Sequence, residues 1–200
     1  MGVLDQLGLK YNADKSSRFH NYLDFYEKVL PDRSFKGRLL EIGVMDGCSQ
    51  MMWREYYPEA EIIGIDIYDK EHLYNSDWGM PESVKLLKLD GTDPKQMEPL
   101  GKFDIIIDDG SHMTKEQQKS FDILYYKQLN ENGIYIIEDL WTSMMREYIN
   151  SRLTTIEWLK RLEKAGMKVE YFFHKHKGIE KIFPEYKGLD SQTVAIKAGQ

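Results

Sequence analysis

The stretch Phe103–His112 reads FDIIIDDGSH and decides the fold. Its first half is a continuous run of apolar, mostly β-branched residues, which is typical of a strand buried on both faces. The run stops abruptly at two acids, a glycine and a histidine, and this composition indicates a turn. We therefore expect a buried strand that ends at Asp108 and Asp109.

A helix and a second buried strand follow. Residues 115–129 carry apolar side chains at helical spacing, and Ile134–Ile137 is another apolar run, which ends at Glu138 and Asp139. Two parallel strands joined by a helix point in the same direction, because their connection is a right-handed crossover. Their carboxyl ends form the edge at which open α/β sheets bind ligands. Five side chains should meet there: Asp108, Asp109, His112, Glu138 and Asp139.

This acidic group predicts a cation site. Four carboxylates and an imidazole at one edge repel one another unless a cation or a proton lies between them. Mg²⁺ prefers carboxylate and water oxygens, so a hard divalent ion is the expected occupant. The alternative is structural, because an acid at a strand end often caps the following helix, and Asp109 has that position. Convergence of five titratable groups favours a metal or catalytic site.

The rest of the chain supplies further strands and helices. Three strands are expected ahead of Phe103, at residues 38–43, 61–66 and 84–89. Helices are expected at residues 22–30, from Ser49 onward, at 92–100 and at 154–165. Residues 169–174 and 192–198 read as a final antiparallel pair.

These elements predict an α/β fold. We expect a Rossmann-like doubly wound sheet, mostly parallel with an antiparallel C-terminal strand pair, and helices on both faces. Residues 1–200 are predicted to form one domain, with an N-terminal helical segment at 1–37 and the Rossmann-like core at 38–200. The polar stretch at residues 10–17 reads as a surface loop that ends in a helix cap.

Composition excludes several classes of function. The 200 residues carry a net charge of −6, and the 27 basic side chains are scattered, which disfavours a nucleic-acid partner. No apolar run reaches the length of a membrane span. The single cysteine, Cys48, cannot form an internal disulfide, which fits a cytoplasmic protein. We expect a small-molecule partner and leave homo-oligomerisation open.

Three motifs at the ends of the earlier strands suggest an adenosine cofactor. Glu41-x-Gly43-x-x-x-Gly47 follows a strand, and its glycines let the backbone approach a ligand, although a purely structural turn explains them as well. The spacing differs from the dinucleotide G-x-G-x-x-G. Asp66 can accept both hydroxyls of a ribose or cap a helix. Asp90 can lie beside an adenine, but Asp-Gly is also ordinary turn chemistry.

Taken together, EIGVMDG at 41–47, IDI at 65–67, DDGSH at 108–112 and IED at 137–139 resemble class I S-adenosylmethionine-dependent methyltransferases. More narrowly, the set is similar to the metal-dependent sugar O-methyltransferases of macrolide biosynthesis, of the mycinamicin and tylosin type, and to the cephalosporin-hydroxylase-like group. The segment YNADK at 11–15, followed by His20 and Tyr22, also resembles the segment before the first strand of these enzymes.

The resemblance implies a role for each motif. The residues implied to bind S-adenosylmethionine are Glu41, Gly43, Gly47, Asp66, Ile67, Asp90, Gly91 and Asp108. Those implied to hold Mg²⁺ are Asp109, Glu138 and Asp139. His112 would be the general base, with Asp109 beside it in the catalytic group. The macrolide enzymes carry further substrate-binding elements, for which 200 residues leave little room. The resemblance therefore does not imply which acceptor this chain methylates.

The expected reaction is transfer of a methyl group to a hydroxyl of a small polyhydroxylated acceptor, a sugar or a glycoside. A bound divalent ion lowers the pKa of a coordinated hydroxyl, and a neutral histidine can take the proton. Two alternatives use the same residues differently. One is a metal-dependent hydroxylase- or hydrolase-like enzyme of the cephalosporin-hydroxylase group, and the other is a non-catalytic module that binds an adenosine cofactor.

Overall fold

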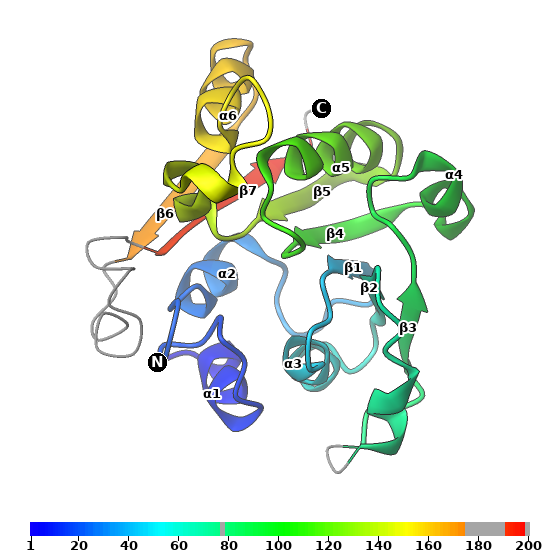
Figure 1. Cartoon of the computed structure of the whole chain (residues 1–200). Helices are drawn as coiled ribbons and strands as arrows, with labels where there is room; N and C mark the ends of the chain where they lie inside the picture. Colours follow the sequence, from blue (N-terminus) through cyan, green and yellow to red (C-terminus); the bar gives the residue numbers. More distant parts are fainter. Residues whose placement is uncertain (77–78, 175–190, 199–200) are drawn as a thin grey trace.

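A seven-stranded sheet forms the centre of the computed structural model, which describes residues 1–76, 79–174 and 191–198 (Figure 1). The strands are β1 (Arg38–Ile42), β2 (Glu61–Asp66), β3 (Val84–Lys88), β4 (Phe103–Asp108), β5 (Leu129–Ile137), β6 (Val169–His174) and β7 (Ser191–Lys197). Their order is β3-β2-β1-β4-β5-β7-β6. Neighbours among β1 to β5 are parallel, whereas β7 runs antiparallel to both β5 and β6. The predicted mixed sheet with an antiparallel C-terminal pair is confirmed.

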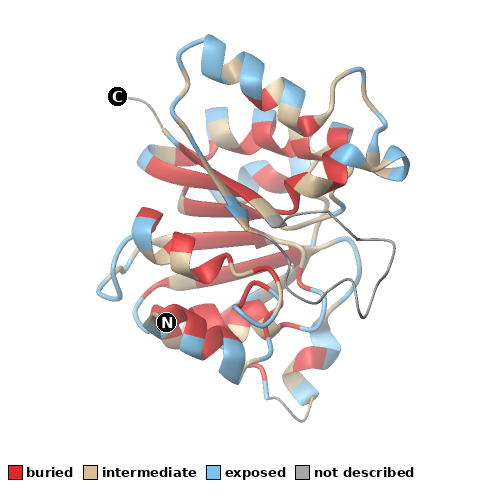
Figure 2. Cartoon of the chain, turned by 90° about the vertical axis from the view of Figure 1, so that its left-hand side faces the viewer, coloured by how far each residue is buried: buried red, intermediate tan, exposed pale blue. Residues whose placement is uncertain are grey.

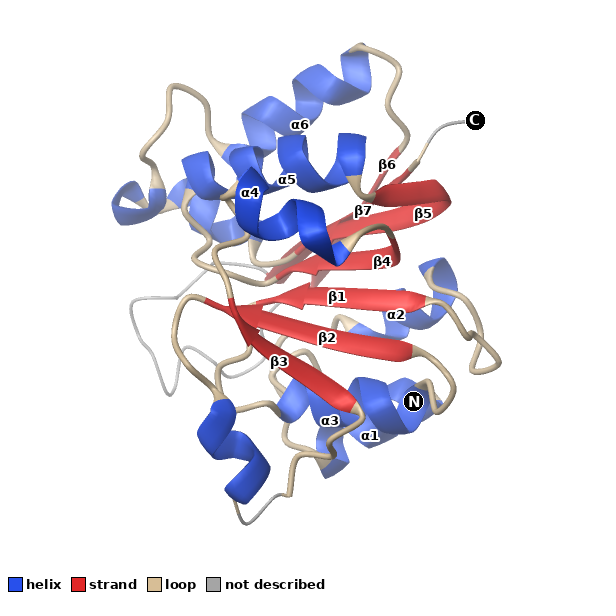
Figure 3. Cartoon of the chain, turned by 90° about the vertical axis from the view of Figure 1, so that its right-hand side faces the viewer, coloured by secondary structure: helices blue, strands red, loops and turns tan. Residues whose placement is uncertain are grey.

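Helices cover both faces of this sheet (Figure 3). On one face lie α1 (Val3–Lys10), α2 (Leu23–Val29) and α3 (Cys48–Tyr56). On the other lie α4 (Pro94–Met97), α5 (Thr114–Lys127) and α6 (Thr155–Lys164). Short 3-10 turns are η1 (Glu71–Asn75), η2 (Glu98–Leu100), η3 (Leu140–Met144) and η4 (Arg146–Tyr148). No helix in the described part of the chain is both long and apolar enough to cross a membrane.

Two hydrophobic cores follow from the alternation of strand side chains. In β4, Ile105 and Ile107 pack with the side chains of α1, α2 and α3, whereas Ile106 packs with those of α5 and α6. All three isoleucines are fully buried, and Figure 2 shows the strands buried along most of their length. Burial on both faces explains why the strand reads as a continuous apolar run rather than an alternating one.

The strand order creates the crevice that positions the site. β1 and β4 lie side by side, and the chain proceeds from them toward opposite edges of the sheet. At such a switch point the loops after the two strands turn away from each other and leave a crevice at the carboxyl ends. The predicted ligand-binding edge therefore lies where β1 and β4 end.

The N-terminal segment departs from the prediction in two ways. It contains a helix that was not predicted, α1, whose central Gly8 weakens the helical pattern. A side chain at Gly8 would meet Leu23 Cδ1 at 2.3 Å, so the glycine lets α1 approach α2. The predicted surface loop at residues 10–17 is wrong in part, because Ala13, Lys15 and Ser16 are buried.

Candidate functional site

A pocket of about 1090 Å³ lies at the carboxyl ends of the parallel strands. Ligand pockets are usually about 300–1,000 Å³, so it has room for a cofactor and a second molecule. The predicted site residues that line it are Gly43, Asp66, Ile67, Asp90, Gly91, Asp108, Asp109, His112 and Asp139. Glu41, Gly47 and Glu138 do not line it. Residues of the N-terminal segment, among them Asn12, Asp14 and His20, form another part of its wall.

The glycine turn after β1 is required by the packing of two strand ends. Gly43 has a φ of +94°, and a Cβ added there would lie 2.0 Å from the carbonyl oxygen of Asp109. Only glycine allows this approach. Gly47, with a φ of +78°, comes directly before α3. The glycines thus have a structural role, and Gly43 also lies on the pocket wall.

The acid at the end of β2 organises the neighbouring loop. Asp66 accepts hydrogen bonds from the backbone N–H groups of Val44, at 3.1 Å, and Tyr68, at 2.9 Å. Ile67 beside it is 59% exposed. Asp90, at the next strand end, accepts from the backbone N–H and the hydroxyl of Thr92, both at 2.8 Å. Asp90 thus forms the turn that was its structural alternative. Asp66 does not cap a helix, because the next helix, η1, begins at Glu71. Both acids line the pocket.

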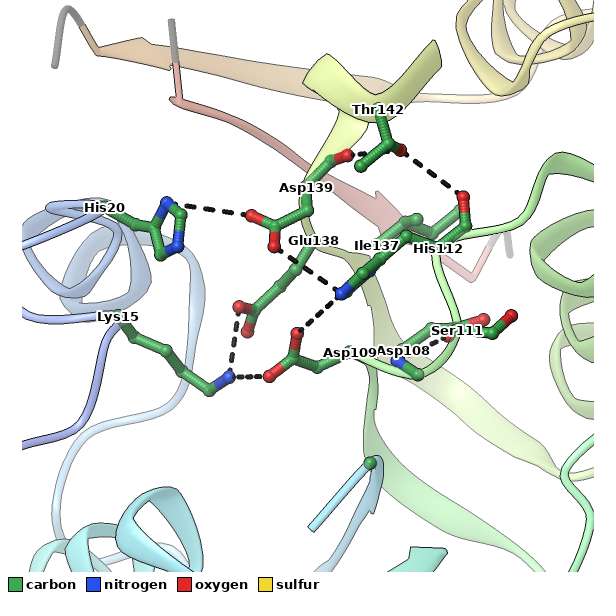
Figure 4. A network of polar contacts seen from close by, with 12 residues as sticks. Lys15, His20, Asp108, Asp109, Ser111, His112, Ile137, Glu138, Asp139 and Thr142 are labelled. Atoms are coloured by element: carbon green, nitrogen blue, oxygen red, sulfur yellow. Dashed lines mark hydrogen bonds and ion pairs between the residues drawn. The ribbon is translucent and has the colours of Figure 1, made fainter. Parts of the chain in front are cut away.

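His112 lies between two carboxylates, as Figure 4 shows. Its Nε2 atom is 3.6 Å from Asp139 Oδ2 and 3.9 Å from Asp109 Oδ1. His112 and Asp139 both adopt left-handed backbone conformations, with φ values of +58° and +53°. The hydroxyl of Thr142 lies between the carbonyl oxygens of His112, at 3.3 Å, and Asp139, at 2.7 Å, and shares its one hydrogen between them. This hydroxyl fixes two strained residues, as is common at functional sites.

Asp139 is held in its ionised form. Burial by itself raises the pKa of a carboxyl group. The His20 and His112 imidazoles and a hydrogen bond from the Tyr22 hydroxyl outweigh burial and lower the pKa of Asp139 to about 2. Tyr22 donates to Asp139 Oδ1 at 2.7 Å, and His20 Nδ1 lies 3.8 Å from the same oxygen. A permanently charged carboxylate suits cation binding.

Lys15, which has no predicted role, occupies the centre of the remaining acids. Its side chain is fully buried, and its ammonium contacts Asp109 Oδ2, Glu138 Oε2 at 3.0 Å and Glu41 Oε1 at 3.2 Å. Burial lowers the pKa of a lysine, but these three carboxylates outweigh it and raise the pKa well above its usual value. The sequence predicts a cation between the acids, and the Lys15 ammonium is a cation between Glu41, Asp109 and Glu138. Its only signal was the resemblance of the surrounding YNADK segment.

The two glutamates beside Lys15 face away from the pocket. Glu41 Oε2 accepts from Ser49, Gln50 and Trp53 at 2.9, 2.7 and 3.1 Å, and burial raises its pKa to about 7 despite Lys15. Glu138 Oε1 accepts from Tyr26 at 2.6 Å, and burial, together with Asp109, raises the pKa of Glu138 well above its usual value. One ammonium does not neutralise three acids, so the pKa values of Glu41, Asp109 and Glu138 all lie above those of free carboxyl groups.

Asp108 faces the opposite side of the sheet from Asp109, because successive strand side chains alternate. Its carboxylate accepts hydrogen bonds from the Ser120 hydroxyl and, at 3.2 Å, from the Tyr135 hydroxyl. Burial raises its pKa to about 6. Asp108 lines the pocket, but its hydrogen bonds tie β4 to α5 and β5. Of the five side chains predicted to meet, Asp109, His112 and Asp139 do lie together. Glu138 lies behind them, against Lys15 and Tyr26, and Asp108 is separate.

The donors at this point fit a divalent ion. One ligand atom each from Asp109, His112 and Asp139 lies within 4.8 Å of the others. Mg²⁺ is commonly held by one or two carboxylates and keeps several waters, so Asp109 and Asp139 suffice. Atoms of Glu41, Asp109 and Glu138 form a second group of this kind, and its cation is the Lys15 ammonium.

No family model matches the chain, but comparisons with individual proteins are informative. L-olivosyl-oleandolide 3-O-methyltransferase of Streptomyces antibioticus is 32% identical over 157 residues, which cover 72% of this chain and 39% of that protein. Mycinamicin VI 2''-O-methyltransferase of Micromonospora griseorubida is 32% identical over 152 residues, which cover 70% and 36%. The chain thus spans less than half the length of these relatives.

A solved structure extends the similarity to the fold. The MycE methyltransferase of the mycinamycin biosynthetic pathway, in complex with Mg and SAH, matches with a TM-score of 0.76 and 25% identity. The match covers 98% of this chain and 55% of that one. These findings confirm the predicted resemblance. The chain has the class I S-adenosylmethionine-dependent methyltransferase fold and is similar in sequence to macrolide sugar O-methyltransferases.

Proposed function

We propose that this chain transfers a methyl group from S-adenosylmethionine to a hydroxyl of a sugar or related diol, with the help of a divalent ion such as Mg²⁺. The observation that carries the proposal is the placement of Asp109, His112 and Asp139 in one pocket with the strand-end acids Asp66 and Asp90. The relatives named above are O-methyltransferases, and the MycE complex contains Mg and SAH. None of these names favours the hydroxylase- or hydrolase-like alternative.

The methyl donor would bind along the ends of β1, β2 and β3. Each oxygen of Asp66 accepts one backbone hydrogen bond, and a carboxylate oxygen can accept a second one, here from a ribose hydroxyl. The exposed Ile67 offers apolar surface to an adenine. Asp90 and Gly91 line the same part of the pocket. Gly43 would face the methionine portion through its backbone. Glu41 contributes indirectly, because its carboxylate points at Lys15 and α3.

Asp109 and Asp139 would hold the divalent ion. When bound, the ion lowers the pKa of an acceptor hydroxyl by several units and orients a vicinal pair of hydroxyls. Asp139 remains ionised at any physiological pH, since its pKa is about 2. Glu138 stays a predicted ligand, and its two oxygens already contact Lys15 and Tyr26.

His112 would take the proton of the acceptor hydroxyl at Nε2. The hydroxyl oxygen forms a bond to the methyl carbon as the sulfur–carbon bond breaks, which leaves S-adenosylhomocysteine. Asp139 and Asp109, 3.6 and 3.9 Å from Nε2, stabilise the positive charge that the imidazole acquires. The chain contributes chiefly by holding the two reactants in line and keeping the base next to the nucleophile.

The proposal is tested by following S-adenosylhomocysteine release from a panel of methyl glycosides, with and without Mg²⁺. Glycosides with free vicinal hydroxyls should react, and a chelator should stop the reaction. His112→Ala should lower the rate by roughly 10²–10⁴-fold. His72→Ala, at an exposed histidine in η1, is the matched control. Equal rates for His112→Ala and wild type would remove the base, and binding of S-adenosylmethionine without any turnover would favour the non-catalytic module.

A further inference from the structure

The N-terminal segment reaches the acidic strand ends from behind. Lys15 contacts Glu41, Asp109 and Glu138. Tyr26 donates to the other oxygen of Glu138, and Tyr22 donates to Asp139. Their partners at the ends of β4 and β5, Asp109, Glu138 and Asp139, lie more than 90 positions away in sequence. None of the three has a place in the proposed reaction, although all are fully buried.

These contacts fix the direction in which each oxygen of Asp109 and Asp139 faces. Asp109 turns Oδ2 to Lys15 and Oδ1 toward His112. Asp139 turns Oδ1 to Tyr22 and Oδ2 toward His112. We call Oδ2 of Asp109 and Oδ1 of Asp139 the outer oxygens, and the other two the inner oxygens. Figure 4 shows the inner oxygens directed at the same imidazole nitrogen, with Lys15 on the far side of Asp109.

Tyr22 is itself held rigidly. Its ring stacks on His20, with centroids 5.1 Å apart, and on Tyr26, at 6.3 Å, and it meets the edge of Phe172. Its side chain is fully buried, so water does not compete for the hydrogen bond to Asp139. A donor that is fixed by packing determines the rotation of the carboxylate it binds, as the outer partners of metal ligands do.

We propose that Tyr22 and Lys15 are positioning residues of the divalent-cation site. Each holds the outer oxygen of one acid, Asp139 or Asp109, and so directs the inner oxygen to the place where the ion is held. The inference rests on the proposed function, because it assumes that these two acids bind the ion. It adds that the affinity for the ion depends on the N-terminal segment, which contains none of the predicted site residues.

The main test is Tyr22→Phe, which keeps the stacked ring and removes only the hydroxyl. The affinity for Mn²⁺, measured by electron paramagnetic resonance of the free ion, should fall by roughly 10–100-fold. The affinity for S-adenosylhomocysteine, measured by calorimetry, should stay within about twofold, since Tyr22 does not line the pocket. Tyr57→Phe is the matched control, because Tyr57 is equally buried in the same aromatic stack and donates to the carbonyl oxygen of Pro31 at 2.8 Å.

Lys15→Arg provides a second, independent variant. It keeps the positive charge, so the attraction between the site and the ion is unchanged, but a planar guanidinium cannot reproduce the three contacts of the ammonium. The Mn²⁺ affinity should again fall by roughly tenfold or more. Lys10→Arg, at an exposed lysine that pairs with Glu55, should bind the ion like the wild type.

The outcomes separate this inference from the function on which it rests. If the wild type binds S-adenosylhomocysteine but no divalent ion, the metal part of the proposed function fails. If the wild type binds Mn²⁺ and both Tyr22→Phe and Lys15→Arg bind it equally well, only the positioning roles are overturned. A lowered melting temperature with unchanged Mn²⁺ affinity in either variant would show that its residue acts on stability alone.

Discussion

At the scale of single residues, Lys15 carries the charge balance of the acidic edge. Its ammonium contacts carboxylates at the ends of β1, β4 and β5, and no other lysine among the described residues contacts three acids. A buried charge without its partner is strongly unfavourable, whereas a buried pair contributes little net stability. Lys15 therefore acts mainly by preventing repulsion among Glu41, Asp109 and Glu138.

Lys15→Met should lower the free energy of unfolding by about 3–5 kcal/mol at pH 8, because it leaves three carboxylates buried without a cation. The loss should be smaller at pH 5, where those carboxylates take up protons. Urea unfolding at the two pH values measures this. Lys10→Met removes an exposed lysine from the same segment and should unfold like the wild type. Equal losses at both pH values would show that the damage comes from packing rather than charge.

Asp108 should make stability depend on pH. Its pKa is raised from 3.8 to about 6 in the folded state, so between these values the folded protein binds a proton that the unfolded chain has released. This contribution therefore falls as pH rises from about 4 to about 6, by about 3 kcal/mol at 1.36 kcal/mol per pKa unit. Asp108→Asn, which cannot ionise, should lose it.

The measurement is urea unfolding of wild type and Asp108→Asn between pH 4 and 7. The difference in unfolding free energy should shift in favour of the asparagine variant as pH rises. A constant difference over this range would mean that the folded state does not raise the pKa of Asp108. The same variant should keep its S-adenosylhomocysteine affinity if the carboxylate serves α5 and β5, as its hydrogen bonds to Ser120 and Tyr135 suggest.

At the scale of elements, the contact between the loop after β1 and the end of β4 sets the geometry of the pocket. Gly43 →Ala would force a Cβ to within 2.0 Å of the Asp109 carbonyl oxygen. It should lower the free energy of unfolding by at least about 2 kcal/mol and weaken S-adenosylhomocysteine binding, since the strand ends must separate. Gly166→Ala is the control, because its φ is also positive, +99°, with nothing within 4 Å. Equal effects of the two variants would show that backbone strain alone, and not the strand contact, matters.

The elements that the sequence predicts well are those whose pattern is local. Buried strands such as β4 leave an apolar run that stops at polar turn residues, so β4 and the β5 run ending at Ile137 were predicted together with the acids that follow them. α1 was missed because it has only eight residues, with Gly8 inside, and forms by packing against α3. β5 begins at Leu129, earlier than predicted, through a register shift against β4.

Lys15 could not be predicted by this route. Its burial depends on partners 94 and 123 residues away, and a lysine in a polar stretch looks like part of any surface loop. Asp108 and Asp109 face opposite sides of the sheet because strand side chains alternate. Which of the two faces the acids of the site can be predicted only when the last residue of the strand is known. The sequence therefore predicts which strand ends carry the site, while the structure decides which oxygens face it.

At the scale of the whole molecule, three parts of the chain meet at the carboxyl edge of the sheet. Asp109 and Asp139 follow β4 and β5, and the loops after β1, β2 and β3 line the pocket in which we propose that the methyl donor binds. The N-terminal segment contacts these two acids through Lys15 and Tyr22. The aligned regions cover 39% and 36% of the two relatives named above, so their acceptors do not carry over to this chain. The panel of methyl glycosides tests which hydroxyls react.

The most direct test of the account is paired titration of S-adenosylhomocysteine and Mn²⁺ into wild type and Asp139→Asn. The wild type should bind both. Asp139→Asn should bind S-adenosylhomocysteine within a few-fold of wild type but lose most of its Mn²⁺ affinity, because the acid serves the ion and not the methyl donor. Failure of the wild type to bind S-adenosylhomocysteine, or equally tight Mn²⁺ binding by Asp139→Asn, would contradict the proposed site.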